Sequence, residues 1–224
     1  MACEMKPWLC HPAMLMGSSW KPKEVFMKIK RNAWLVAVSM ALSVAGYSVC
    51  QAASAVVEEL KHEQAALSKA LAQSKLGLIE GIQQSTKTGE VAISAKFELD
   101  DAGKLSLSIY TAENGLNIGS EHNVLKELSG SPAQDKWNPA AEVFKDIPHI
   151  KRSSEQLTLM RLSPFTLIDI LAKVQKTHRG VVFSITPAIQ GNKPVFVVLK
   201  DAGGGKVTEL DYSLLNGSLL TASK

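Results

Sequence analysis

The chain carries the same order of predicted elements twice, and this internal repeat limits its fold more than any other feature. In each half, a stretch with apolar residues at helical spacing is followed by three stretches in which apolar and polar residues alternate. These stretches are 67–84, 91–99, 105–110 and 124–128 in the first half, and 164–177, 181–186, 195–199 and 207–212 in the second. Helical spacing indicates an amphipathic helix, and alternation indicates a strand with one buried face. We therefore predict an α+β fold of two repeated units, each a helix packed on a three-stranded antiparallel sheet.

Short sequence matches support the repeat. Leu78-Ile79-Glu80 in the first half matches Leu167-Ile168-Asp169 in the second, and Gly89 matches Gly180. The alternative is a chance likeness between two α+β halves. The second helix has the clearer predicted start, because Ser163-Pro164 combines an N-cap residue with a proline at the first helical position.

A leader with a signal peptide is predicted ahead of the repeat, over residues 1–55. A basic stretch at 28–31 precedes an uncharged apolar run at 33–49, and Ala53-Ser54-Ala55 supplies the small residues that signal peptidase accepts. Met27 is the predicted true start, because the residues before it would make the basic region unusually long for a signal peptide. We therefore expect the protein to be exported, and to be periplasmic or secreted.

The rest of the chain divides into a first unit over 56–130, a connector over 131–161 and a second unit over 162–224. The uncharged run of the leader continues to Val57 and is long enough to span a bilayer. The alternative to cleavage is therefore an uncleaved anchor, and we expect membrane contact only through that anchor.

The charge of the chain is concentrated in the leader. The whole chain has 25 Lys and Arg residues and 21 Asp and Glu residues, of which six and two lie in residues 1–55, so 19 of each remain. A neutral domain lacks the basic footprint that nucleic-acid binding requires. All three cysteines, Cys3, Cys10 and Cys50, also lie in the leader, which excludes a disulfide, a thiolate metal site and a cysteine nucleophile from the domain.

The second half resembles the PepSY domain family. The resemblance rests on the helix over 167–176, the strand over 181–186, the run Pro194-Val195-Phe196-Val197-Val198, and the ending over 205–211 with 214–220 after it. PepSY domains are known from the propeptides of thermolysin-type metallopeptidases and from bacterial envelope proteins. The resemblance implies a module without catalytic residues that binds in the cell envelope and that inhibits or regulates a peptidase.

The connector fits neither copy of the repeat and offers apolar side chains among prolines. We predict a partner-contact surface here, formed by Trp137 and Phe144 and rimmed by Lys145, Lys151 and Arg152. The alternative is that Trp137 and Phe144 fill the gap between the two units.

The sequence contains no recognisable catalytic or metal motif. The histidines of the domain, His62, His122, His149 and His178, have none of the spacings that zinc sites use, and no serine lies in a G-x-S-x-G motif. We therefore predict no catalytic residue, no metal and no cofactor.

Two functions remain as hypotheses. The first is an exported, non-catalytic binding or regulatory module of the cell envelope, with a protein partner and a peptidase as the class that the family resemblance implies. The alternative is a periplasmic protein that binds a small ligand or a metal ion in a cleft between the units.

Overall fold

The computed structural model describes residues 62–86 and 89–223. They belong to one compact unit, Tyr47–Lys224, and a second unit, Met1–Gly46, lies outside the described residues. The predicted leader, its start at Met27 and its cleavage after Ala55 also lie outside them. The described residues contain four helices and one eight-stranded antiparallel sheet, which confirms the α+β prediction.

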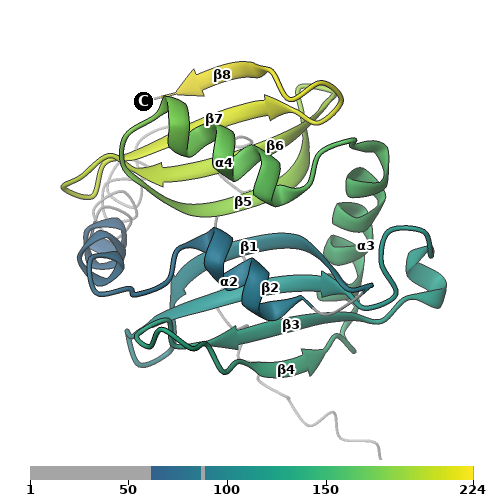
Figure 1. The fold of residues 1–224 in the computed structure, drawn as a ribbon, viewed down its shortest axis with the longest axis horizontal. Coiled ribbons are helices and arrows are strands. Elements are labelled where there is room, and N and C mark those ends of the chain that lie inside the picture. The colour runs from purple at the N-terminus through teal and green to yellow at the C-terminus, as the bar shows by residue number, and fades with distance from the viewer. Residues whose placement is uncertain (1–61, 87–88, 224) are drawn as a thin grey trace, which may run out of the picture. The chain divides into compact units, whose positions relative to one another are not determined.

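All eight strands join one sheet in the order β4-β3-β2-β1-β5-β6-β7-β8 (Figure 1). Their bounds are β1 Val91–Leu99, β2 Leu105–Ala112, β3 Leu125–Gly130, β4 Ala140–Val143, β5 Val181–Gln190, β6 Lys193–Asp201, β7 Val207–Ser213 and β8 Leu219–Ser223. Every neighbouring pair is antiparallel. The six predicted strands are all present, and β4 and β8 are additional edge strands.

The two halves are joined by the pairing of β1 with β5, where Ala95 lies opposite Ile185 and Lys96 opposite Ser184. The prediction of a three-stranded sheet in each half is therefore wrong, because each half contributes four strands to a sheet that both share. The strand order of the second half mirrors that of the first. The register also shifts at matching places, between Ala92 and Ser94 in β1 and between Val182 and Ser184 in β5.

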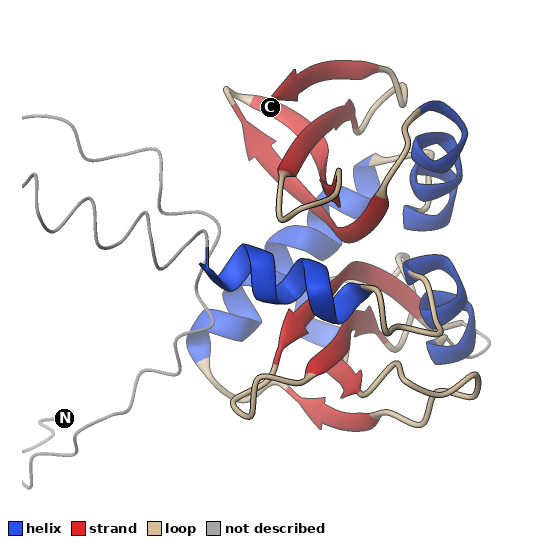
Figure 2. Ribbon diagram, turned by 90° about the vertical axis from the view of Figure 1, so that its left-hand side faces the viewer, coloured by secondary structure: helices blue, strands red, loops and turns tan. Residues whose placement is uncertain are grey.

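Helices α2 (Leu78–Ser85) and α4 (Leu167–Thr177) cover one face of the sheet side by side (Figure 2). The strands turn their larger apolar side chains toward this face, because Phe97 lies opposite Leu107 and Phe196 opposite Tyr212 in the register. Leu107 and Phe196 are fully buried. The main core therefore lies between these two helices and the sheet.

Helix α4 begins three residues later than the sequence indicated. Its N-cap is Thr166, which exchanges hydrogen bonds with Asp169 in a capping box. Ser163 instead ends the preceding helix, and its hydroxyl donates to the carbonyl of Leu214 at 2.8 Å. A serine before a proline was misread as the cap because the true capping pair follows within the next turn.

The single helix predicted over 67–84 is two helices. Residues 62–71 are helical, and α2 begins only at Leu78, with Gly77 as its N-cap. In the break between them, the Lys75 amide donates to the Pro132 carbonyl at 3.0 Å and the Ser74 hydroxyl donates to the Leu76 carbonyl at 2.7 Å. Glycine is a poor helix former, and Gly77 lies at the end of this break, directly before α2.

Helix α3 (Ile147–Leu162) lies on the opposite face of the sheet, where it contacts β1, β3 and β5 (Figure 2). It occupies the end of the segment that the sequence analysis treated as a connector, and it spans the junction of the two halves. A short 3-10 helix, η2 (Ser120–His122), also contacts it. On the inner face of α3, the side chains of Leu157 and Met160 are buried, and so are the polar side chains of Ser153 and Gln156.

Candidate functional site: the start of helix α3

The first turn of α3 is held in place by one carboxylate. Asp146 is the N-cap residue, and its Oδ1 accepts a hydrogen bond from the His149 amide at 3.1 Å. The imidazole Nδ1 of His149 lies 2.7 Å from Oδ2 of the same carboxylate. These hydrogen bonds lower the pKa of Asp146 below its ordinary value. The Asp146–His149 pair therefore serves to begin the helix.

Aromatic rings connect this turn to the sheet. The Phe144 ring stacks on the imidazole of His149, with centroids 5.3 Å apart, and meets the Tyr110 ring edge-on at 5.1 Å. Lys96 Nζ lies 5.9 Å from the centroid of the Tyr110 ring. Phe144 therefore fixes the start of α3 against β2 and is only partly available to a partner.

Arg152 faces the sheet from the second turn of α3. Burial raises the pKa of Tyr110, the charges of Glu127 and Glu98 raise it further, and Arg152 opposes them by its charge and a hydrogen bond. The Tyr110 hydroxyl consequently stays protonated, and it accepts the hydrogen bond from Arg152, because a guanidinium group only donates. Arg152 was predicted as part of the rim of a contact surface, and the structure places it against Tyr110.

Three large apolar side chains are exposed beside this anchored turn. Val143 is 47% exposed, Ile147 80% and Ile150 41%. Ile147 and Ile150 share one face of α3, since residues three apart in a helix are neighbours. Lys145 and Lys151 are exposed beside them, as is Glu142 in β4. We call Lys145, Ile147, Ile150 and Lys151 the α3 surface. Val143 is not part of it, because it lies opposite Lys126 in the register, on the face of the sheet that α2 covers.

Trp137 is not part of the α3 surface. It is only 5% exposed, its indole Nε1 donates to the Gly130 carbonyl at 3.3 Å, and its amide donates to Gln84 Oε1 at 2.8 Å. Gln84 lies in α2 and Gly130 in β3, so Trp137 packs within the first half. The sequence predicted Trp137 as part of a contact surface or as a core residue, and the structure places its side chain in the core.

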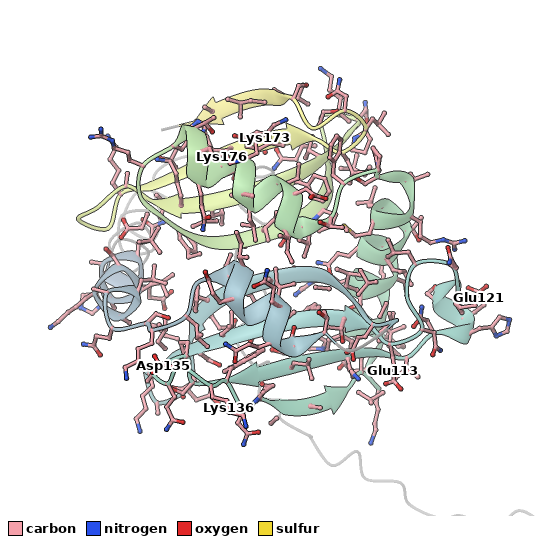
Figure 3. The ribbon with its side chains drawn as sticks, viewed as in Figure 1. Glu113, Glu121, Asp135, Lys136, Lys173 and Lys176 are labelled. Atoms are coloured by element: carbon pink, nitrogen blue, oxygen red, sulfur yellow. The ribbon has the colours of Figure 1, made fainter. Side chains whose placement is uncertain are left out.

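The structure also brings together a cluster that the sequence analysis missed. Lys126 Nζ lies 3.2 Å from Glu90 Oε1 and 3.0 Å from Glu113 Oε2. Burial opposes the charge of Lys126, but the two carboxylates outweigh it and raise the pKa of its ammonium group. Figure 3 shows Glu113, which directly follows β2, and Glu121, which extends outward from η2. Because two carboxylates neutralise the charge of the lysine, we interpret the cluster as a structural ion-pair network.

The described residues show no arrangement suited to metal chemistry. Within 62–86 and 89–223, no three His, Cys, Asp or Glu side chains gather closely enough to hold a metal ion. In the same ranges, no helix is both long and apolar enough to cross a membrane. The signal for Ile147 and Ile150 in the sequence is their spacing of three residues around the Asp146-Ile147-Pro148 helix start.

Comparisons with known proteins give one distant structural likeness. No family model matches the chain, and no curated protein matches it. A crystal structure of a putative lipoprotein from Clostridium difficile 630 is similar with a TM-score of 0.33 and 10% sequence identity, over 64% of this chain and 88% of that chain. The PepSY resemblance is not confirmed by these comparisons.

Proposed function

We propose that the chain is an exported, non-catalytic binding or regulatory module of the cell envelope, which holds a protein partner at the α3 surface. We further propose that its halves are copies of one PepSY-like unit and that the partner is a peptidase. The observation that carries the first proposal is the exposed apolar pair of Ile147 and Ile150 on an anchored helix start.

The composition of the α3 surface favours a protein partner. Protein interfaces combine an apolar centre with a polar rim, and large exposed apolar side chains gathered at one place are uncommon on a surface without a partner. Lys145 and Lys151 stand beside Glu142, so the rim carries charges of both signs. A rim of both signs suits another protein surface better than an anionic membrane or nucleic acid, which would favour a purely basic patch.

The rigidity of the site also favours binding. Asp146, His149 and Phe144 fix the first turn of α3 before a partner arrives. A surface that is already ordered loses little side-chain entropy when it binds. The symmetry of the strand order and the matching register shifts support the proposal of two copies.

Photo-crosslinking in the native envelope tests the surface. A photo-reactive amino acid replaces the exposed Pro148, and the captured protein is identified by mass spectrometry. Ile147→Asp should reduce capture by at least about tenfold, because a charge placed in an apolar contact loses its hydration without gaining a partner. The matched control is Ile189→Asp, which changes a side chain of the same type that is 59% exposed on β5.

Equal capture by Ile147→Asp and the unchanged protein would show that the α3 surface does not bind the partner. The peptidase proposal has a separate readout, the hydrolysis of fluorescent casein by an envelope fraction. Added wild-type domain should slow hydrolysis, and the Ile147→Asp domain should not. If capture depends on Ile147 but hydrolysis never changes, the surface stands and the partner is not a casein-cleaving peptidase.

A further inference from the structure

Strand β8 leaves one edge of the sheet open. It pairs with β7 on one side, and among the described residues no strand pairs with its other side. All five of its residues, Leu219–Ser223, are exposed. An edge strand carries a row of free backbone donors and acceptors, which another extended segment can pair with.

The opposite edge of the sheet is protected against such pairing, and β8 is not. Strand β4 carries Glu142 within it and follows directly after Pro139. Charges and proline are the usual means by which an edge strand avoids further strands. β8 contains neither a charged residue nor a proline. Because the sheet is otherwise nearly symmetric, this difference singles out β8 as the edge that accepts a partner.

Two carboxylates lie one strand inward from the open edge, on a single face of the sheet. Asp211 lies opposite Thr221 and Glu209 opposite Ser223, so these four side chains share that face. Asp211 is only 7% exposed, and its Oδ1 has no hydrogen-bond partner among the described residues. The Gln190 amide donates to Glu209 Oε1 at 3.3 Å. A buried carboxylate oxygen without a hydrogen-bond partner is costly, so Asp211 gains from any donor that reaches its side chain.

The spacing of strands sets how far a side chain on an added strand must reach to the carboxylates of β7. Neighbouring strands lie about 4.8 Å apart, so a strand added to β8 would lie about 10 Å from β7. The side chains between them on this face, Thr221 and Ser223, are small. The long side chain of a lysine or arginine on the added strand can cross over them. The register shift of β8 lies between Asp211 and Tyr212, so the last three residues keep regular pairing.

We propose that β8 pairs with an extended segment of another protein that carries lysine or arginine at alternate positions, and that these cations bind Asp211 and Glu209. The backbone of the segment pairs with the open edge, and its alternate side chains supply the specificity. This interaction uses a surface separate from the start of α3 and does not depend on the function proposed there.

Fluorescence anisotropy with a short labelled peptide tests the proposal on the exported domain. In the probe peptide lysine alternates with valine, and in the control peptide glutamate replaces each lysine. We expect the lysine peptide to bind and the glutamate peptide not to bind. Asp211→Asn should weaken binding by at least about tenfold, because it removes a charged hydrogen bond from a buried site.

A matched pair of lysine substitutions in β8 separates the two faces. Thr221→Lys places a cation directly opposite Asp211 and should abolish binding of the peptide. Ala222→Lys lies opposite Leu210 on the other face and should leave binding nearly unchanged. Circular dichroism melts of both variants check that the fold is retained.

Three results would overturn the proposal. Equal binding of the lysine and glutamate peptides would remove the role of the carboxylates. Equal loss in Thr221→Lys and Ala222→Lys would show that binding does not depend on the face of Asp211. If size-exclusion chromatography with light scattering shows a dimer of the unchanged domain that Thr221→Lys dissociates, the edge is occupied by a second copy and not by a basic segment.

Discussion

At the scale of single residues, the buried charges of this sheet are of two kinds, paired and unpaired. Lys126 is the paired case. Its partner Glu90 has a side chain only 3% exposed, whereas Glu113 is 50% exposed. Glu90 Oε1 lies within ion-pair distance of Lys126 but outside hydrogen-bond geometry, so the lysine charge is what compensates for its burial.

We expect Lys126→Met to lower the free energy of unfolding by about 3 kcal/mol, because it leaves the Glu90 carboxylate buried without a counter-charge. Glu113→Gln, which removes a largely exposed partner, should cost less than about 1 kcal/mol. Urea denaturation measures both. The double variant Lys126→Met/Glu90→Gln should recover part of the loss. If Lys126→Met loses no more free energy of unfolding than Glu113→Gln does, the Glu90 carboxylate does not depend on Lys126 in the way described.

Asp211 is the unpaired case, and its effect depends on pH. Burial raises its pKa, and the neighbouring charge of Glu209 raises it further. Because the pKa in the folded state lies above that in the unfolded state, the folded chain binds the proton more tightly. The cost of the charged form is therefore greatest above the raised pKa and disappears as the pH falls below the ordinary value for aspartate, about 4.

Asp211→Asn should therefore stabilise the domain near neutral pH, by on the order of 1 kcal/mol, and the gain should vanish in acid. Thermal melts of the variant and the unchanged domain over a pH series give the two curves. Curves that stay parallel through the acid range would mean that the carboxylate of Asp211 is not the cause.

At the scale of elements, helix α2 approaches the sheet closely enough to exclude a methyl group. Gly81 is buried, and a Cβ placed on it would collide with the Leu107 Cδ2 of β2. Helical propensity and packing therefore act in opposite directions at this position. Alanine favours a helix over glycine by about 1 kcal/mol, whereas overpacking a core costs about 1–3 kcal/mol.

We expect Gly81→Ala to destabilise the domain, because Leu107 is fully buried and has little room to move. Leu107→Val should relieve the collision, so the double variant should be more stable than the sum of the single effects predicts. Gln83→Ala, at an exposed position of the same helix, measures the effect of propensity alone. If Gly81→Ala raises the melting temperature as Gln83→Ala does, the helix does not pack as closely as described.

At the scale of the whole described unit, the pairing of β1 with β5 makes the two halves one sheet, and α3 packs across both strands. Trp137 reports on this coupling, because the chain from Val56 onward contains no other tryptophan and Trp137 packs within the first half. Separate units would unfold independently. A shared sheet and core should unfold in one transition.

Phe196→Ala, which empties a fully buried site in the second half, should therefore shift the transition seen by Trp137 fluorescence. We expect a loss of about 3–5 kcal/mol, equal to that seen by far-ultraviolet circular dichroism. An unchanged Trp137 transition alongside a shifted circular dichroism signal would show that the halves unfold separately.

Much of the candidate site could not be predicted from the sequence. Lys145 and Lys151 were placed in a contact region, and the structure shows both of them exposed in the α3 surface. Trp137 and Arg152 were placed there too, but Trp137 is buried and Arg152 faces Tyr110 in the sheet. The sequence could not show this, because it has no periodicity around these residues that distinguishes an inward from an outward side chain. Ile147 and Ile150 were recognised as apolar residues of the connector but not as one face of a helix, since polar Ser153 and Gln156 occupy the buried face of α3 and hide its helical pattern.

The sequence by itself determined the six strands with alternating apolar residues, the helix predicted over 164–177 apart from its exact start, and the α+β class. Alternation and helical spacing are local, and each reflects a single buried face. Only the tertiary structure decided that β1 pairs with β5, that β4 and β8 extend the sheet, and that α3 covers its second face. Any strand edge offers the same backbone donors and acceptors, so the choice of neighbour depends on which distant residues pack together. The exposed edge strands bury neither face, and they therefore leave no periodic trace in the sequence.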